Sequence, residues 1–293
     1  IDFSNDAKGA LLLEPQRMNL ITYSEEIEAP SKWETVDLTT VSNSIISPNG
    51  TLNGTKIIRN VVGSGSAWIR QRPTVVVGEN YVVSIFGKIG NKSTLNITYY
   101  DATSGDRFFN YNLSTQSITG NGLSNSTYVD SGIEYYGNGW YRCYVVINAL
   151  NTSPQLQFAV GENRASSQGD FIYMYGAMLE QGSYATSYIP TQGAISTRLS
   201  ETCSGGGSDQ VINSTEGVLY AEIKTLSQTG AFRQINISKD SSNRIYISKR
   251  ADNNNLEFRM ENPLGNLNFS FAQDTTTEYL KVAFRYGLNN FAV

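Results

Sequence analysis

The sequence contains no histidine, and only 16% of its 293 residues are charged. Without histidine, Ser-His and Cys-His nucleophiles and imidazole metal sites are excluded within this chain. The charged residues form no basic run and give a formal net charge of −4, so the chain lacks the electrostatic contacts that drive nucleic-acid binding. Among hydrolytic mechanisms, the composition leaves paired carboxylates open.

Long apolar runs and a cysteine framework are missing as well. No stretch approaches the roughly 18–20 apolar residues that span a bilayer, and no basic segment precedes an apolar one near the first residue, so we expect no membrane insertion. The two cysteines are Cys143, inside a predicted strand, and Cys203, in a glycine-rich connector. We expect no bridge between them, which fits synthesis in a reducing cytoplasm even for a protein that works outside a cell.

Asn, Ser, Thr, Gly and Tyr are plentiful instead, and short alternating runs are separated by turn residues. This pattern is typical of β-sandwiches and jelly rolls. Residues 95–99 and 109–113 alternate on either side of the turn DATSGD and predict a hairpin. Residues 171–180, FIYMYGAMLE, are apolar on both faces and predict a strand at the centre of a sheet. Helical signal is limited to one turn at 23–27, for which Ser24 is the candidate cap.

A change of composition divides the chain. Residues 201–215 contain CSGGGSD, which has the composition of a flexible linker. We therefore predict an all-β protein with two jelly-roll-like β-sandwich domains in tandem, at residues 1–200 and 216–293. The last predicted hairpin turn begins at Tyr286 and its return strand has barely started, so we expect the second sandwich to be incomplete.

Two Trp/Arg pairs are candidates for ligand binding. In residues 137–147, GNGWYRCYVVI, strand alternation places Cys143 on the core face and Trp140, Arg142 and Tyr144 on the opposite face. In AWIRQR, Trp68 and Arg70 share a face in the same way. Aromatic rings stack on the apolar faces of sugars while polar groups bind the hydroxyls. The alternative is structural: a ring that plugs the core, or an arginine stacked on a surface ring. The structural role is favoured for Trp140, whereas the structural and the ligand-binding role both stay open for Trp68.

Calcium is the metal most compatible with side chains that offer only oxygen ligands. Asp101 and Asp106 in the turn DATSGD are candidate calcium ligands, although the turn lacks the EF-hand pattern and its closing glutamate. A hairpin turn built from small polar residues is the favoured alternative. The other acidic residues also fall in turns or at strand ends, where they cap turns or are solvated. We therefore expect no catalytic carboxylate pair, no other cofactor and no enzymatic activity.

Three stretches together resemble a known family. They are GALLLEPQRMNLITYSE, GNGWYRCYV and FIYMYGAMLEQGSYATSYIPTQGAISTR, and they bracket nearly all of residues 9–198. Their combination resembles a module that recurs in tailed-bacteriophage fibre, spike and adhesin proteins and is similar to the jelly roll of carbohydrate-binding modules. In residues 216–293, STEGVLYAEI and EYLKVAFRYGLNNFAV look like the start of a concanavalin A-like, laminin-G-like sandwich, which often follows that module.

The resemblance implies a non-enzymatic protein on the virion surface, in a tail or head fibre or a spike, that is synthesised in the host cytoplasm. Its implied partners are polysaccharide or cell-surface glycan, other virion proteins and further copies of itself, since fibres are commonly trimeric. The family motifs are architectural, so the five candidate ligand-binding residues rest on strand alternation alone. Two alternatives stay open: an architectural virion component without glycan binding, and an ancillary binding module of a larger polysaccharide-degrading enzyme.

Overall fold

The computed structural model describes residues 10–28, 30–62, 66–103, 105–208, 210–213, 215–225, 233–250, 255–273, 275 and 279–287. Within these ranges the regular structure is almost entirely β, with short 3-10 turns at η1 (Asn121–Ser124) and η2 (Glu162–Arg164). No helix in this part of the chain is long and apolar enough to cross a membrane. The chain divides into two compact units, Ile1–Thr202 and Cys203–Val293. Residues 288–293, on which the expectation of an incomplete last hairpin rests, lie outside the described ranges.

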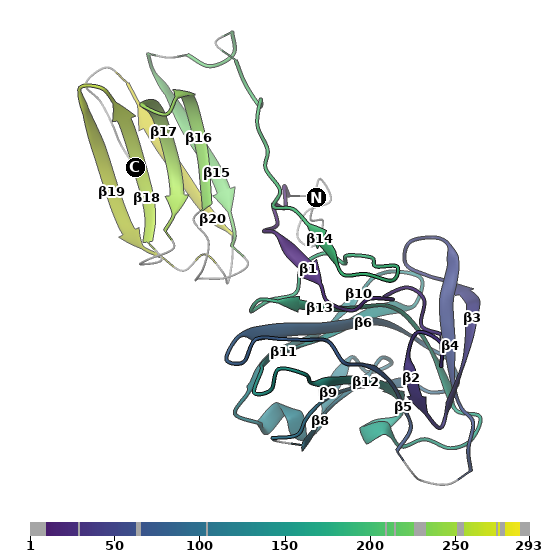
Figure 1. The fold of residues 1–293 in the computed structure, drawn as a ribbon. Helices are drawn as coiled ribbons and strands as arrows, with labels where there is room; N and C mark the ends of the chain where they lie inside the picture. The colour runs from purple at the N-terminus through teal and green to yellow at the C-terminus, as the bar shows by residue number, and fades with distance from the viewer. Residues whose placement is uncertain are drawn as a thin grey trace. The chain divides into compact units, whose positions relative to one another are not determined.

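The first unit is a sandwich of two six-stranded antiparallel sheets (Figure 1). The first, which we call the β6 sheet, has the order β10 (Tyr128–Tyr135), β11 (Trp140–Asn148), β6 (Asn80–Ile89), β13 (Phe171–Gln181), β4 (Leu52–Arg59) and β3 (Leu38–Ile46). The second, the β7 sheet, has the order β2 (Glu34–Val36), β5 (Trp68–Gln71), β12 (Gln155–Val160), β7 (Thr94–Asp101), β8 (Gly105–Asn112) and β9 (Ser117–Thr119). Strands β1 (Arg17–Asn19) and β14 (Ser196–Arg198) form a separate pair.

Two sequence predictions about strands are confirmed. Strands β7 and β8 form an antiparallel hairpin in which Leu95 pairs with Tyr111 and Ile97 with Phe109. Strand β13 lies inside the β6 sheet, between β6 and β4, and most of its residues are buried. The all-β sandwich class that these strands predicted is therefore correct.

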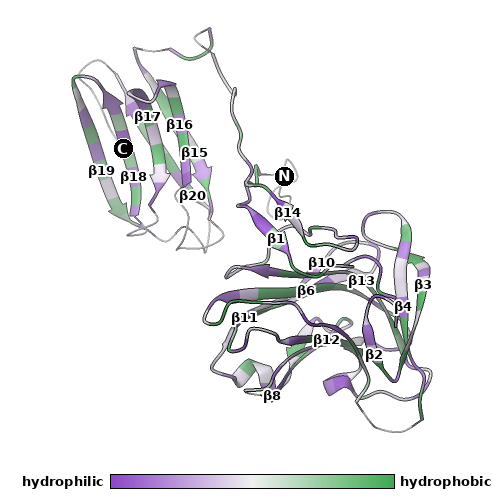
Figure 2. Ribbon diagram, viewed as in Figure 1, coloured by the Kyte–Doolittle hydropathy of each residue, from purple (hydrophilic) through white to green (hydrophobic). Residues whose placement is uncertain are grey.

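The hydrophobic core of the first unit lies between the two sheets. Phe158 and Ile97 from the β7 sheet and Val83 and Cys143 from the β6 sheet are fully buried in it. Figure 2 shows β6 as hydrophobic along most of its length, which matches its nearly continuous burial. Burial of each such aliphatic or aromatic side chain stabilises the fold by about 1.5–3 kcal/mol. Cys143 is buried and Cys203 exposed, and both thiols are free, as the sequence predicted.

The N-terminal segment is tied to residues 186–191 by buried hydrogen bonds. The Asn19 side chain is fully buried; its Nδ2 donates to the carbonyls of Ala177 and Ile189, and its Oδ1 accepts from the N–H of Ile21. Further along, the N–H of Ser24 donates to Thr191 Oγ1 at 3.0 Å, and the N–H of Thr191 donates to Ser24 Oγ at 2.8 Å.

These contacts overturn the helical turn predicted at residues 23–27. The segment has no helical turn, because the hydroxyl of Ser24, the candidate cap, bonds to Tyr188 and the N–H of Thr191 instead of to the following N–H groups. Ile27 is buried in the sandwich core and fixes the far end of the segment. Partners more than 160 residues away thus decide a local conformation that the sequence pattern assigned to a cap.

The second unit is a smaller sandwich. A pair of strands, β15 (Gly217–Ile223) and β20 (Leu280–Tyr286), packs on a four-stranded sheet of β16 (Arg233–Asp240), β17 (Asn243–Lys249), β18 (Asn255–Asn262) and β19 (Gly265–Ala272). Leu219 and Phe284 meet Ile247 and Phe258 in its core. The outer strands are less covered: Phe271 on β19 is 49% exposed although its cross-strand partner, Leu256, is buried.

Candidate functional site

Trp140 is buried and presents no free ring to a ligand. It is 1% exposed, packs with Phe86 and Tyr175, and its indole N–H donates to the carbonyl of Ile46 at 3.0 Å. Gly54 lies against it, since a Cβ added there would be 3.3 Å from the indole. This cluster occupies the face of the β6 sheet that points away from the core, and Tyr188 covers Phe86 with ring centroids 5.7 Å apart.

Arg142 and Tyr144 lie beside Trp140 on the same face, as alternation predicted. Arg142 is 2% exposed, and its guanidinium donates to Ser84 Oγ at 3.1 Å. Tyr144 is half-buried, and burial raises the pKa of its phenol to about 12. Alternation places these side chains on the outer face, but no sequence pattern indicates that residues 14–28 and 182–192 contact that face, as Arg17, Glu25 and Tyr188 do.

Trp68 and Arg70 lie on the other outer face of the sandwich, that of the β7 sheet. The guanidinium carbon of Arg70 is 4.1 Å from the centre of the Trp68 ring. Arg70 also pairs with Glu34 at 2.6 Å and donates to Gln155 Oε1. The two Trp/Arg pairs therefore lie on opposite outer faces of the first unit, and the guanidinium that stacks on Trp68 already has its polar partners.

A row of hydrogen-bonded side chains continues from Arg70 across the β7 sheet. At the other end of the row, the guanidinium of Arg164 on η2 donates to the side chain of Gln157 and to the Asp106 carboxylate, the latter at 2.6 Å. We call this set the polar row: Glu34, Arg70, Gln155, Gln157, Arg164 and Asp106. Each member is hydrogen-bonded to its neighbour in the row.

The two candidate calcium ligands are held by arginines. Asp101 is buried, lies 2.8 Å from the Arg107 guanidinium and accepts the N–H of Thr103, which makes the turn. Asp106 belongs to the polar row. Ser104, between them, lies outside the described residues. No group of three or more Asp, Glu or Cys side chains in the described ranges could hold a metal ion.

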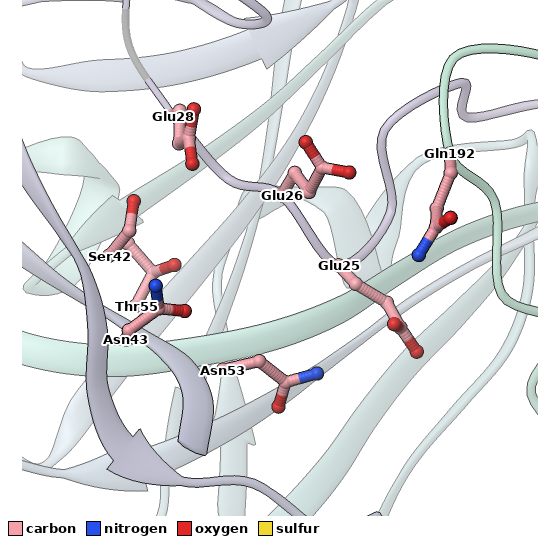
Figure 3. A pocket seen from close by; sticks show the side chains of 8 residues that line it. All are labelled: Glu25, Glu26, Glu28, Ser42, Asn43, Asn53, Thr55 and Gln192. Carbon is pink, nitrogen blue, oxygen red and sulfur yellow. The ribbon is translucent and has the colours of Figure 1, made fainter. Parts of the chain in front are cut away.

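A pocket of about 130 Å³ lies beside residues 25–28, at the edge of the β6 sheet that β3 and β4 form (Figure 3). Four parts of the chain line it: residues 25–28, strand β3, strand β4 and Gln192. In Figure 3 the segment with the three glutamates crosses between the β3 residues and Gln192. The lining residues are Glu25, Glu26, Glu28, Ser42, Asn43, Asn53, Thr55 and Gln192.

Local backbone features explain why these side chains converge. Ser24 and Ile27 are both anchored, so the glutamates between and beside them are held next to strands β3 and β4. On β3, the pairing with β4 shifts register between Val41 and Ile45, and Asn43 in this bulge takes a left-handed conformation with φ of 53°. Asparagine tolerates that conformation better than most residues. Ser44 closes the bulge by donating to the carbonyl of Val41 at 2.6 Å.

Several polar side chains that line the pocket make no hydrogen bond to another described residue. Thr55 is only 1% exposed, yet its hydroxyl makes no hydrogen bond with any described residue. The Oδ1 atom of Asn53 is buried without a partner. The side chains of Ser42, Asn43 and Gln192 likewise make no hydrogen bond within the described ranges. The pocket therefore concentrates hydrogen-bonding capacity that the protein itself does not use.

The charged groups of the pocket are unevenly paired. Lys32 bonds to Glu26 and lies 3.1 Å from Glu28, and these two hydrogen bonds raise the pKa of its ammonium, which stays charged. Glu25 Oε1 accepts a hydrogen bond from the phenol oxygen of Tyr175 at 2.5 Å. Burial, and then the bond to Glu25, raise the pKa of Tyr175 well above its usual value, so Tyr175 remains a donor. Glu25 forms no ion pair with any described residue.

No protein-family model matches the chain, and no curated protein sequence matches it. Three solved structures give partial likenesses. The enzymatically active domain of tailspike protein 4 from bacteriophage CBA120 aligns at 15% identity, with a TM-score of 0.35, over 56% of this chain and 21% of that chain. Xylanase 10B of Clostridium thermocellum, as its CBM22-1–GH10 modules with xylohexaose, aligns at 16% identity, with a TM-score of 0.32, over 61% of this chain and 30% of that chain. A candidate sugar-binding protein of Bacteroides thetaiotaomicron VPI-5482 aligns at 11% identity, with a TM-score of 0.32, over 56% of this chain and 100% of that chain.

Sequence reasoning missed the pocket entirely, since none of its lining residues was among the candidates. Its members come from positions 25 to 192 and share no spacing, so no local pattern could have found them. Part of the polar row could have been predicted, because Gln155 and Gln157 alternate along the strand with the core residues Leu156 and Phe158. Amides in place of charged residues on an outward face were the available signal.

Proposed function

We propose that this chain is a non-enzymatic, glycan-binding component of a virion surface fibre or spike, and that the pocket holds part of the glycan. The observation that carries the proposal is the set of unpartnered polar groups in the pocket, above all the buried Oδ1 of Asn53 and the hydroxyl of Thr55, a residue that is 1% exposed. An unsatisfied buried polar group costs about 1–3 kcal/mol, so native proteins keep such groups where water or a ligand supplies the bond. Sugar hydroxyls both donate and accept, which suits a lining of mixed hydroxyls, amides and carboxylates.

The size of the pocket limits what it holds. Its volume of about 130 Å³ compares with roughly 30 Å³ for one water molecule, and with the roughly 300–1,000 Å³ of sites that enclose a drug-sized ligand. The pocket thus accommodates one edge or substituent of a sugar ring. We infer that it receives a chain end or a side branch, while the rest of the glycan lies over the surface.

The assignment to a virion rests on the family resemblance of the three motifs, and the structure gives those motifs a physical role. Asn19 in EPQRMNL, and Tyr188 and Thr191 in YIPT, make the buried bonds that close the sandwich. The proposal includes the implied partners, namely other virion proteins and a homo-oligomer, commonly a trimer. Two alternatives stay open: an architectural component, which the experiment below separates, and the ancillary module of a larger polysaccharide-degrading enzyme, for which a catalytic domain in the sequence flanking this chain is the test.

The test is a glycan array and affinity electrophoresis with the full chain, followed by Thr55→Val. Valine keeps the shape of threonine and removes the unpartnered hydroxyl. We expect binding about threefold to tenfold weaker, the value of one hydrogen bond, with an unchanged or higher melting temperature. Thr119→Val, at an exposed position on β9, is the matched control.

The outcomes test glycan binding, the non-enzymatic assignment and the place of the site. Retention on no polysaccharide would favour the architectural component. Release of new reducing ends from a bound polysaccharide would contradict the non-enzymatic assignment. Equal binding by wild type and Thr55→Val would exclude the pocket as the site.

A further inference from the structure

The pocket combines unpartnered hydrogen-bonding groups with an excess of negative charge. The carboxylates of Glu25, Glu26 and Glu28 line it, and the cation that pairs with them among the described residues is Lys32, which bonds to Glu26 and Glu28. Glu25 receives one hydrogen bond, from the phenol of Tyr175. Since an ionised carboxylate accepts up to about four hydrogen bonds, Glu25 keeps free acceptor positions at the pocket.

We propose that the pocket binds a protonated primary amine, and that this amine belongs to an amino sugar of the glycan. An ammonium group carries three N–H donors and no acceptor. The pocket lining contains three acceptors of the kind that an ammonium needs, namely the carboxylate of Glu25, the hydroxyl of Thr55 and the buried Oδ1 of Asn53, which has no partner. Charge-assisted hydrogen bonds of this kind are about twice as strong as neutral ones. The inference rests on the proposed function, because its source of the amine is a bound glycan.

Other ligands suit the pocket less well. An acidic sugar would place a carboxylate beside three others, which is unfavourable at short range. A divalent cation needs several converging oxygen ligands, and no such acidic group occurs among the described residues. An N-acetylated amino sugar replaces the ammonium by a neutral amide that donates a single N–H. The predicted order of affinity is therefore free amine, then neutral or N-acetylated sugar, then acidic sugar.

The experiment is titration calorimetry of the full chain with oligosaccharides of equal length and linkage built from glucosamine, N-acetylglucosamine, glucose or glucuronic acid. It is run at about pH 6, where a primary amine is protonated. We expect the glucosamine oligomer to bind at least about tenfold more tightly than the N-acetylated and acidic oligomers. Glu25→Gln, which keeps an acceptor for Tyr175, is expected to abolish this preference. Glu162→Gln, at an exposed carboxylate outside the pocket, is the matched control and is expected to retain it.

Each result has one meaning. Neutral and N-acetylated oligomers bound as tightly as the glucosamine oligomer would overturn the amine site and leave the proposed function standing. Binding of none of the four, nor of any polysaccharide, would overturn the proposed function itself. Cadaverine tests the source of the amine: equal affinity for this diamine, lost in Glu25→Gln, would support the ammonium site and overturn its assignment to a sugar. If Glu25→Gln does not fold, the preference is tested in Thr55→Val, where an unchanged preference would contradict the inference.

Discussion

At the scale of single residues, the indole of Trp140 fills the outer face of the β6 sheet and its N–H bonds to the carbonyl of Ile46. We expect Trp140→Ala to lower the free energy of unfolding by about 3–5 kcal/mol, because it opens a cavity and leaves that carbonyl unpaired. Urea denaturation measures this loss. Trp68→Ala is the matched comparison: Trp68 is half-buried beneath Arg70, so its loss should stay near 1 kcal/mol. Similar losses in both variants would contradict the assignment of Trp140 to a core role.

Glu180 predicts a dependence of stability on pH. It is fully buried, accepts bonds from the N–H and hydroxyl of Thr186, and faces the guanidinium groups of Arg17, at 3.4 Å, and Arg142. Burial raises the pKa of its carboxyl despite these partners. The folded state therefore binds the proton more tightly than the unfolded state. The stability that this proton contributes is fully present below the unfolded pKa, about 4.3, and is lost as pH rises through the folded pKa.

We therefore expect Glu180→Gln to be more stable than the wild type at neutral pH, with a difference that shrinks toward pH 4. Glutamine fills the same space and still accepts the N–H of Thr186, while its amide nitrogen can donate to the hydroxyl. Urea denaturation across this pH range gives the comparison. The exposed Glu162→Gln should show no such trend. A variant that is equally destabilised at every pH would show that the ion pair with Arg17 outweighs the burial of the charge.

At the scale of elements, η2 and the β7 sheet are coupled through Arg164. Its guanidinium joins Gln157 on β12 to Asp106 on β8 and lies 4.9 Å from the ring of Phe108. We expect Arg164→Ala to cost about 2–4 kcal/mol, because the Asp106 carboxylate and the Gln157 carbonyl lose their shared donor. The backbone at position 164 is left-handed, with φ of 64°. Arginine and alanine both carry a Cβ, so the strain of this conformation is the same in the wild type and in Arg164→Ala.

Arg164→Lys serves as the control for charge. Lysine keeps the positive charge and loses the planar fork that reaches two partners, so an intermediate loss is expected. Thermal unfolding in low and high salt separates the two contributions. A full rescue by lysine would mean that charge alone, and not the bridge between strands, stabilises this face.

Elements also show what the sequence could and could not predict. Alternation correctly placed Cys143, Val145 and Ile147 of β11 in the core, because a strand has only two faces and one of them was apolar. It could not tell that the other face is covered, since that depends on Tyr188 and Thr191, which meet Ser24 only in the folded chain. The pocket was hidden for the same reason: a bulge at Asn43 and the tie at Ser24 bring its walls together.

At the scale of the whole molecule, the chain divides at Cys203, which falls within residues 201–215, the segment whose composition predicted a linker. Each unit has its own hydrophobic core. The three tryptophans, at positions 33, 68 and 140, all belong to the first unit. Cys143 lies in the core of that unit, and burial raises the pKa of its thiol. Tryptophan fluorescence and Cys143 labelling are thus two independent probes of one unit.

We expect one thiol, Cys203, to react with a maleimide in the native protein, because it is exposed, whereas Cys143 is fully buried and lacks thiolate character. With increasing urea, labelling of Cys143 should follow the change in tryptophan fluorescence, since opening the core exposes both. Circular dichroism reports on the strands of both units. It should therefore show a further transition if the two cores unfold separately. Cys203→Ser should remove the labelling of the native protein and leave the labelling of Cys143 in urea unchanged. Labelling of Cys143 at urea concentrations below the fluorescence transition would contradict a single cooperative core between the β6 and β7 sheets.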